Sequence, residues 1–317
     1  MIREPDQAYE IQRAWRDSRI QASVSDSPQS LWHYTDAHGL EGIVENQYFW
    51  ATETRFLNDA AETTYGQDVF LTVLEELVRN RESRTRDLIA KAFFGAGRPA
   101  SSFVDEHSRT FVTCFCDDGD LLSQWRAYAG RDSVGGYALE FCPPGALVNW
   151  AIAAPIDPPV QLRKISYDPL EQEREARRLI EPLLAVMGPH VYDKSISNSC
   201  VAALVDGMVD FSSAAKHPSF AEEREWRFIY TVPKDLGMAK PTLPVKHRVS
   251  GGVFLPYVQL TVLAGVGTSY NRLPLRTINC GPSLHPARKK RGLESYLSER
   301  TGYKGVNVTG SDSPAYL

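Results

Sequence analysis

The sequence predicts a single α+β domain in which strands and helices are mixed along the chain. Runs rich in β-branched and aromatic residues are interleaved with segments of helical period, without the strict alternation of a doubly wound parallel sheet. The chain has 317 residues, of which 43% are hydrophobic and 23% are charged. This length and composition allow a sizeable core, and they exclude a disordered chain, a collagen-like chain and a disulfide-stabilised miniprotein.

The first 30 residues are expected to be a lead-in to the fold. Residues 23–30 are rich in serine, and we expect the domain itself to span residues 31–317. The N-terminal part of that domain predicts a short helix after Thr35-Asp36, an extended run at 48–52, a strong helix that begins at Asn58-Asp59, and a helix over 84–94.

The rest of the domain predicts further strands and helices, with a helical insertion around 168–216. The expected elements are strands at 111–116, 136–142 and 160–167, a helix that begins at Asp168-Pro169, an apolar-periodic segment at 195–215, strands at 226–232, 260–266 and 276–280, a helix at 287–300 and a last strand near Val306. Four consecutive basic residues at 288–291 lie on the last helix. We interpret them as a solvated helical face.

Charge and cysteine content exclude several classes of protein. The net charge is 35 − 39 = −4, so the chain has no global basic field for nucleic acid or an anionic membrane. No apolar run approaches the roughly 20 residues of a membrane helix, and the N-terminus lacks the pattern of a signal peptide. The five cysteines are odd in number and lack a C-x-x-C pair, which favours a reducing cytoplasm. No metal-binding motif is present, so no metal is expected.

Four segments combine polar and aromatic residues with apolar neighbours, and the first is residues 31–35. If it forms a strand, His33 and Thr35 share one face, and Trp32 and Tyr34 share the other. An imidazole and a hydroxyl side by side at a strand end would make a polar clamp for a ligand. A core histidine beside a helix-capping threonine explains the same residues, and these residues alone favour that interpretation.

The second segment lies at the start of the strong helix. Asp59 and Glu62 are three residues apart, a spacing that suits a capping role at a helix N-terminus. That role explains neither Arg55 nor Asn58, which remain candidates for binding a ligand.

The third segment contains Ser123, Trp125, Arg126 and Tyr128, with glycines at 130, 135 and 136 close behind. An exposed tryptophan and tyrosine flanked by glycines could stack on a planar ring of a ligand. An aromatic plug that closes the end of a sheet explains the same residues as well.

The fourth segment carries two carboxylates at the entry of a strong β run. Glu223 and Glu225 are two residues apart, so their side chains are expected to point to the same side. Two carboxylates held together repel, and this favours a raised pKa on one of them. The alternative is a solvated acidic turn paired with Arg224 and Arg227.

The ordered set of these motifs resembles a bacterial family of proteins of unknown function, family 2971. The resemblance extends from about residue 31 to the C-terminus and rests on His33-Tyr34-Thr35, Asn58-Asp59 with Glu62, Ser123-Gln124-Trp125, Glu223-Arg224-Glu225-Trp226-Arg227 and Gly281-Pro282.

More distantly, the order of the motifs is similar to that of ADP-ribosyltransferases. The resemblance implies a split, curved mixed sheet flanked by helices, with NAD as the substrate. His33 and Thr35 match the motif that holds the adenosine ribose, and Glu223 and Glu225 match an E-x-E motif with Glu225 as the catalytic residue. The ring-stacking position matches several residues: Trp125, Tyr128, Tyr65 or, as a serine variant, Ser123. The remaining cofactor-binding candidates are Asn58 and, toward the pyrophosphate, Arg55 or Arg126.

This resemblance implies an enzyme that cleaves the nicotinamide–ribose bond and transfers ADP-ribose to an undefined acceptor, in toxin or phage-defence biology. An ionised Glu225 would stabilise the oxocarbenium-like charge, and Glu223 would orient or deprotonate the nucleophile. On this hypothesis Glu225→Gln abolishes NAD cleavage and leaves thermal stability nearly unchanged. Two alternatives remain: a catalytically inactive nucleotide-sensing or protein-interaction module, and a nucleic-acid-processing enzyme whose Glu223, Glu225 and Asp59 hold Mg²⁺.

Overall fold

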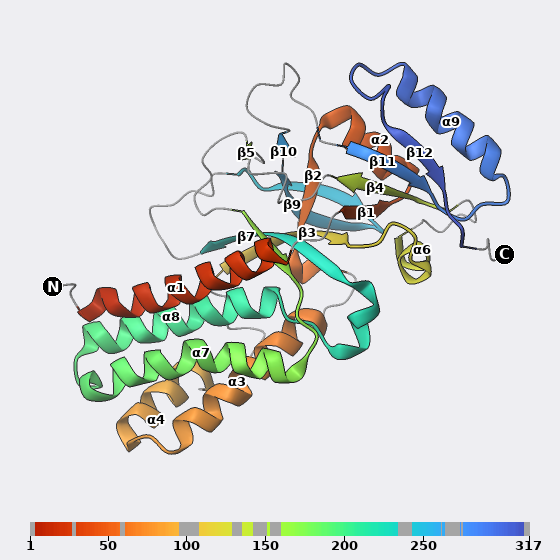
Figure 1. Cartoon of the computed structure of the whole chain (residues 1–317). Coiled ribbons are helices and arrows are strands. Elements are labelled where there is room, and N and C mark those ends of the chain that lie inside the picture. The colour runs from red at the N-terminus through yellow and green to blue at the C-terminus, as the bar shows by residue number, and fades with distance from the viewer. Residues whose placement is uncertain are drawn as a thin grey trace.

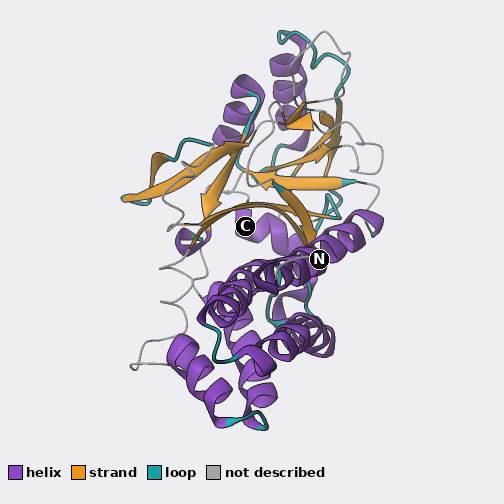
Figure 2. Cartoon of the chain, turned by 90° about the vertical axis from the view of Figure 1, so that its left-hand side faces the viewer, coloured by secondary structure: helices purple, strands orange, loops and turns teal. Residues whose placement is uncertain are grey.

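The computed structural model describes residues 4–26, 30–57, 61–94, 108–128, 135–141, 151–152, 160–233, 243–260, 262–263, 273 and 275–313. These residues form a curved mixed sheet with helices on both of its faces, and most of the helices gather below the sheet (Figures 1 and 2). The expected α+β class is therefore confirmed, as are the curved sheet and the helices that flank it.

The main sheet contains ten strands. These are β1 (Leu31–Thr35), β2 (Phe49–Glu53), β3 (Ser108–Cys116), β4 (Tyr137–Phe141), β6 (Gln161–Lys164), β7 (Glu225–Pro233), β8 (Lys246–Ser250), β9 (Val253–Leu260), β11 (Leu275–Cys280) and β12 (Asn307–Gly310). Their order is β12-β11-β4-β1-β3-β2-β9-β8, with β7 pairing with both β3 and β6. The β11–β12 pair is parallel and the other pairs are antiparallel. A separate small sheet pairs β5 (Ala151–Ile152) with β10 (Val262–Leu263).

One face of the sheet is covered by α2 (Ala37–Asn46) and α9 (Pro286–Ser298), as Figure 1 shows. The helix α2 begins where the sequence predicts, because Asp36 accepts a hydrogen bond of 2.7 Å from the Gly39 N–H. Its apolar residues at helical spacing pack against the sheet together with Leu293 and Leu297 of α9.

The other face meets a layer of long helices (Figure 2). The layer consists of α1 (Glu4–Ser25), α3 (Ala61–Arg79), α4 (Ser83–Ile89) with the π-helical turn η2 (Ala90–Phe94), α7 (Pro169–Met187) and α8 (Lys194–Ser213). As predicted, α7 begins at Asp168-Pro169, where the Asp168 carboxylate accepts a hydrogen bond of 2.8 Å from the Leu170 N–H. The layer has its own apolar core, separate from the core beneath α2 and α9.

Two features differ from the sequence prediction. Residues 4–25 are not a lead-in but the helix α1, whose Trp15 is only 5% exposed and donates a hydrogen bond to the Glu175 carbonyl of α7. The helix carries many polar residues, so its apolar stripe is weak in the sequence. The hairpin of β8 and β9 was not predicted, whereas the strand expected at 260–266 is found in part, as β10 at 262–263. Residues 264–266 lie outside the described residues.

Candidate functional site

Strand β3 divides the candidate residues between two sides of the sheet. Side chains alternate along a strand, so Phe111 and Phe115 point into the core beneath α2 and α9, which we call the core face. Val112 and Cys114 point the other way, toward Ala214 at the end of α8, and we call that side the helical face. Because β1 and β7 both pair with β3, this division also places their side chains.

His33 lies on the core face. Its ring packs against Phe49 and Phe115, with centroid distances of 5.3 Å and 5.6 Å. Its Nδ1 is 2.9 Å from the Cys114 carbonyl oxygen. Burial lowers the pKa of His33, although the contact with this carbonyl acts in the opposite direction. His33 is therefore a core histidine, as the second interpretation of this segment predicted.

Glu225 lies on the helical face, because it stands opposite Cys116 in the β3–β7 pair. Trp32 of β1 also stands opposite Cys116, which places His33, one residue further along β1, on the reverse side of the sheet. The expectation that His33 and Glu225 face one shared hollow is therefore wrong. The alternation of Trp32 and Tyr34 against His33 and Thr35 is confirmed.

Four charged residues surround this position, and we call Lys216, Glu223, Glu225 and Arg227 the carboxylate cluster. The Arg227 guanidinium donates to both oxygens of Glu225, at 2.7 Å and 2.8 Å. The Lys216 ammonium lies 2.5 Å from Glu223 and 3.4 Å from Glu225, so it bridges the two carboxylates. The Cys114 thiol also hydrogen-bonds Glu225.

Burial differs sharply between the two carboxylates of the cluster. Residue Glu225 is only 6% exposed, and both cations that bind it are buried as well. The Glu223 side chain is 23% exposed. The cluster thus consists of an enclosed ion pair, Glu225 with Arg227, and an outer carboxylate, Glu223, that reaches water.

Local backbone geometry positions both carboxylates. Glu223 ends the 3-10 helix η6 (Pro218–Glu223), and Arg224 follows in the left-handed region with φ of 45°. This conformation is uncommon for a residue with a side chain, and it turns the chain from η6 into β7. The Glu225 N–H then donates to the Tyr167 hydroxyl at 3.0 Å, and its carbonyl accepts from the Ile165 N–H at 3.1 Å.

The backbone around Lys216 is held just as firmly. Its N–H donates to the Ser166 carbonyl at 3.0 Å, and its own carbonyl accepts a hydrogen bond of 3.0 Å from the Gln172 side chain. The Tyr65 hydroxyl donates in turn to Gln172 at 2.8 Å. Segments from α3, α7, α8 and β7 therefore meet at the cluster, and Lys216 reaches it from the chain that leaves α8.

The cluster determines the ionisation of Glu225. Burial alone would raise its pKa, but the charges of Arg227 and Lys216 outweigh burial, and the pKa lies below its usual value. This is the opposite of the raised pKa that repulsion between two carboxylates suggested. Because Lys216 bridges Glu223 and Glu225, the repulsion is compensated.

The rim of the cluster is a second, more exposed set of charges. Arg224 pairs with Asp118 at 2.5 Å and approaches Asp117 at 3.3 Å. The acidic-turn interpretation paired the glutamates with Arg224 and Arg227. Arg227 does bind Glu225, but Arg224 binds the two aspartates instead. Burial raises the pKa of Asp117. The nearby Ser123 hydroxyl is enclosed and makes no hydrogen bond to any described residue.

Trp125 has a structural role in the fold. It is only 4% exposed, its indole N–H donates to Asp120 at 2.7 Å, and its ring meets Tyr34 edge-on at 4.6 Å. A Cβ atom on Gly281 would lie 2.7 Å from this ring. Trp125 is thus the aromatic plug, and its faces are occupied by protein.

The other predicted residues are scattered. Arg55 binds Glu53, a buried carboxylate on the core face that Arg109 also binds. Thr35 packs its hydroxyl against Gly39 at the start of α2. Arg126 and Tyr128 lie on the exposed side of α6 (Leu122–Tyr128), which contacts η6. Residues 58 and 59 lie outside the described residues. The helix α6, which carries Ser123, Arg126 and Tyr128, therefore contacts the η6 segment that ends at Glu223, whereas His33, Thr35 and Arg55 lie elsewhere.

Sequence reasoning missed Lys216 and Cys114 as members of the site. Lys216 follows the last apolar turn of a predicted helix, where a lysine is common, and the cysteine pattern indicates no role for Cys114. The usable signal was the short spacing from Lys216 through Glu223 to Arg227, which places four charged residues of both signs around one strand entry.

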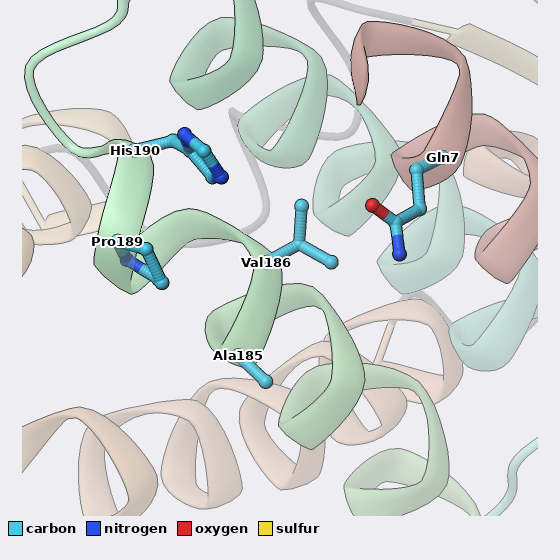
Figure 3. Close-up of a pocket in the computed structure, with 5 residues that line it drawn as sticks. All are labelled: Gln7, Ala185, Val186, Pro189 and His190. Carbon is cyan, nitrogen blue, oxygen red and sulfur yellow. The ribbon is translucent and has the colours of Figure 1, made fainter. Parts of the chain in front are cut away.

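One hollow in the structure lies apart from the carboxylate cluster. Figure 3 shows a hollow of about 320 Å³ between α1 and the end of α7, lined by Gln7, Ala185, Val186, Pro189 and His190. It shares no residue with the cluster. Across the same described ranges no group of three potential metal ligands occurs, and no helix is long and apolar enough to cross a bilayer.

Comparison with protein families gives one match. Residues 124–228, about a third of the chain, match a family described as protein of unknown function, DUF2971. The matched region runs from α6 through β7 and contains all four members of the carboxylate cluster. Comparisons with curated proteins and with solved structures found no match. Similarity to this family was expected over most of the chain, and it is found over the segment that builds the cluster.

Proposed function

We propose that the protein is an ADP-ribosyltransferase-like enzyme that cleaves NAD, with Glu223 as the carboxylate that faces the substrate. Glu225, which the E-x-E resemblance makes catalytic, is in this proposal the fixed member that holds Lys216. The substrate is taken from the motif resemblance. The assignment of roles is carried by one observation, the exposure of Glu223 beside an enclosed Glu225.

The Lys216 bridge makes this division of roles chemically reasonable. A carboxylate that stabilises a developing cation must be able to release its own counter-ion. Lys216 is bonded to Glu223 at 2.5 Å and also lies 3.4 Å from Glu225. When Glu223 turns toward a substrate cation, Lys216 keeps Glu225 as its partner, so no buried charge is left alone. Glu225 itself cannot turn without breaking both of the hydrogen bonds that it accepts from Arg227.

The reaction needs only these groups and the substrate. The nicotinamide–ribose bond breaks, its electron pair leaves with nicotinamide, and the ribose becomes oxocarbenium-like. An ionised Glu223 stabilises that charge and accepts the proton that the attacking nucleophile loses. Arg126, exposed on α6, supplies positive charge for the two phosphates.

The test compares single substitutions in an assay that separates nicotinamide from NAD by chromatography. We expect Glu223→Gln to lower the rate by about 10²–10³-fold, the size of effect seen when an electrostatic stabiliser is removed. Glu222→Gln, the adjacent exposed carboxylate, is the matched control and should retain the rate. NAD that stays intact with the unmodified protein, or an equal loss in both variants, would overturn the proposal.

A second candidate is a module that binds a nucleotide without turnover. It is favoured by the position of His33 in the core and by the enclosed ring of Trp125. In these positions His33 cannot hold the adenosine ribose, and Trp125 cannot stack on nicotinamide, as the matching residues of ADP-ribosyltransferases do. Equilibrium dialysis with labelled NAD, followed by chromatography of the bound label, distinguishes the two. The module predicts bound and intact NAD.

A further inference from the structure

The parallel end of the sheet leaves a strand edge that no described strand covers. β12 is the last strand in the sheet order, with β11 on its inner side. The N–H and C=O groups on the outer side of such a strand can pair with another extended chain. Figure 1 shows α9 beside this strand, far from the long-helix layer.

A hollow of about 330 Å³ lies where α9 meets β12. Lys290, Glu294 and Ser298, spaced four residues apart along one side of α9, form one wall, and Asn307 of β12 forms the other. At its floor lie Leu297 and Val308, which are only 2% and 7% exposed, so the polar side chains of the walls make up most of the accessible surface. An open edge strand beside a wall of polar and charged helix side chains offers backbone pairing and side-chain contacts to an added strand.

The charge around this hollow is positive, although the whole chain is acidic. Lys290 and Lys304 line the hollow, and the basic run of residues 288–291 begins α9. Lys290 pairs with Glu294 only at 3.9 Å, with both side chains nearly half exposed. Such an exposed pair contributes little to stability, and the charged lining residues Lys290, Lys304 and Glu294 together carry one net positive charge. Arg288, Lys290 and Arg291 of the basic run are exposed, as expected of a solvated face, and Lys290 also lies beside the open strand edge.

We propose that β12 and α9 form a docking site for an extended, acidic segment of a partner protein. The segment adds to the sheet next to β12, and its carboxylates meet Lys290 and Lys304. A second copy of this chain fits less well, because pairing of two β12 strands would bring two basic flanks together. The inference is independent of the proposed enzymatic function.

The test measures the fluorescence anisotropy of a labelled hexapeptide of alternating Glu and Val against the full-length protein. We expect saturable binding, weakened at least tenfold by Lys290→Glu with Lys304→Glu. Arg291→Glu, a charge reversal on α9 outside the hollow, is the control and should weaken binding much less. A peptide of alternating Lys and Val should bind the double variant better than the unmodified protein.

Backbone methylation separates strand addition from attraction by charge alone. In an added strand the N–H groups of alternate residues point toward β12, so N-methylation of one alternate set should abolish binding and methylation of the other should spare it. Equal effects of the two sets would overturn the proposal. Absence of saturable binding, or a single-stranded oligonucleotide that binds with the same dependence on both lysines, would overturn it as well.

Discussion

Replacement of Glu225 by glutamine tests the enclosed ion pair directly. The carboxylate accepts two hydrogen bonds from Arg227 and lies within 3.4 Å of Lys216, and all three residues are at most 6% exposed. Glutamine has the same shape but no charge, and its amide group turns a donor toward one of these cations. Removing one partner of a buried ion pair costs about 3–5 kcal/mol, because the other charge stays buried and uncompensated.

Thermal unfolding followed by circular dichroism measures this loss. For a chain of this size, about 3–5 kcal/mol corresponds to a fall in Tm of roughly 5–8 °C. Glu222→Gln is again the control, and as an exposed substitution it should change stability by less than about 0.5 kcal/mol. A Glu225→Gln variant as stable as the control would refute the interpretation of Glu225 as an enclosed anchor, and it would restore the sequence-based expectation of a catalytic residue.

The pH dependence of the stability difference between the unmodified protein and Glu225→Gln is a second test of the ion pair. The pKa of Glu225 is lowered in the fold, so its stabilisation is present above the ordinary value of 4.5 and is lost as the pH falls through the folded value. The stability difference between the unmodified protein and Glu225→Gln should therefore be constant near neutral pH and shrink below pH 4.5. A difference that does not depend on pH would contradict the charge argument.

Two further predictions concern the segment around Gly281. Burial lowers the pKa of Lys289 to about 8. The unfolded chain therefore binds more protons than the folded chain between pH 8 and 10.5, and this residue makes stability rise with pH across that window. NMR titration of methylated lysines should find one midpoint near 8, and midpoints all near 10.5 would contradict the effect of burial. Gly281→Ala should cost about 1–3 kcal/mol, because the new Cβ would lie 2.7 Å from the Trp125 ring. Gly292→Ala, exposed within α9 and with nothing within 4 Å, should instead stabilise by about 0.5–1 kcal/mol in urea unfolding, and equal effects of the two alanines would refute the packing argument.

Much of the local structure could be predicted from the sequence. Asp36 and Asp168 cap helices at the predicted residues, because a short acidic side chain before an apolar period satisfies free N–H groups at a helix start. The alternation of Trp32 with His33 was also predicted correctly, since side chains in a strand alternate whatever the surroundings. The helix α1 was missed because its stability comes from contacts of residues such as Trp15 with α7, and not from a strong local pattern.

The candidate site shows where such reasoning stops. Glu223 and Glu225 were selected from the sequence, and their shared direction was predicted. The lowered pKa of Glu225 was not predicted, because it depends on the charges of Arg227 and Lys216, of which Lys216 arrives from the end of α8, and on a buried position that only packing creates. Spacing along the chain says nothing about which charge a fold brings from another element.

The amino-acid pattern by itself determined the α+β class, the helix starts, the side-chain alternation of each strand and the pair of carboxylates before β7. The tertiary structure alone decided which side of the sheet each side chain meets. Alternation sorts residues into two sets, but the pairing of β3 with β1 and β7 and the packing of the long helices decide which set meets the core. These contacts join residues far apart in the chain. They therefore placed His33 and Glu225 on opposite sides of the sheet, although the motif order had suggested one shared site.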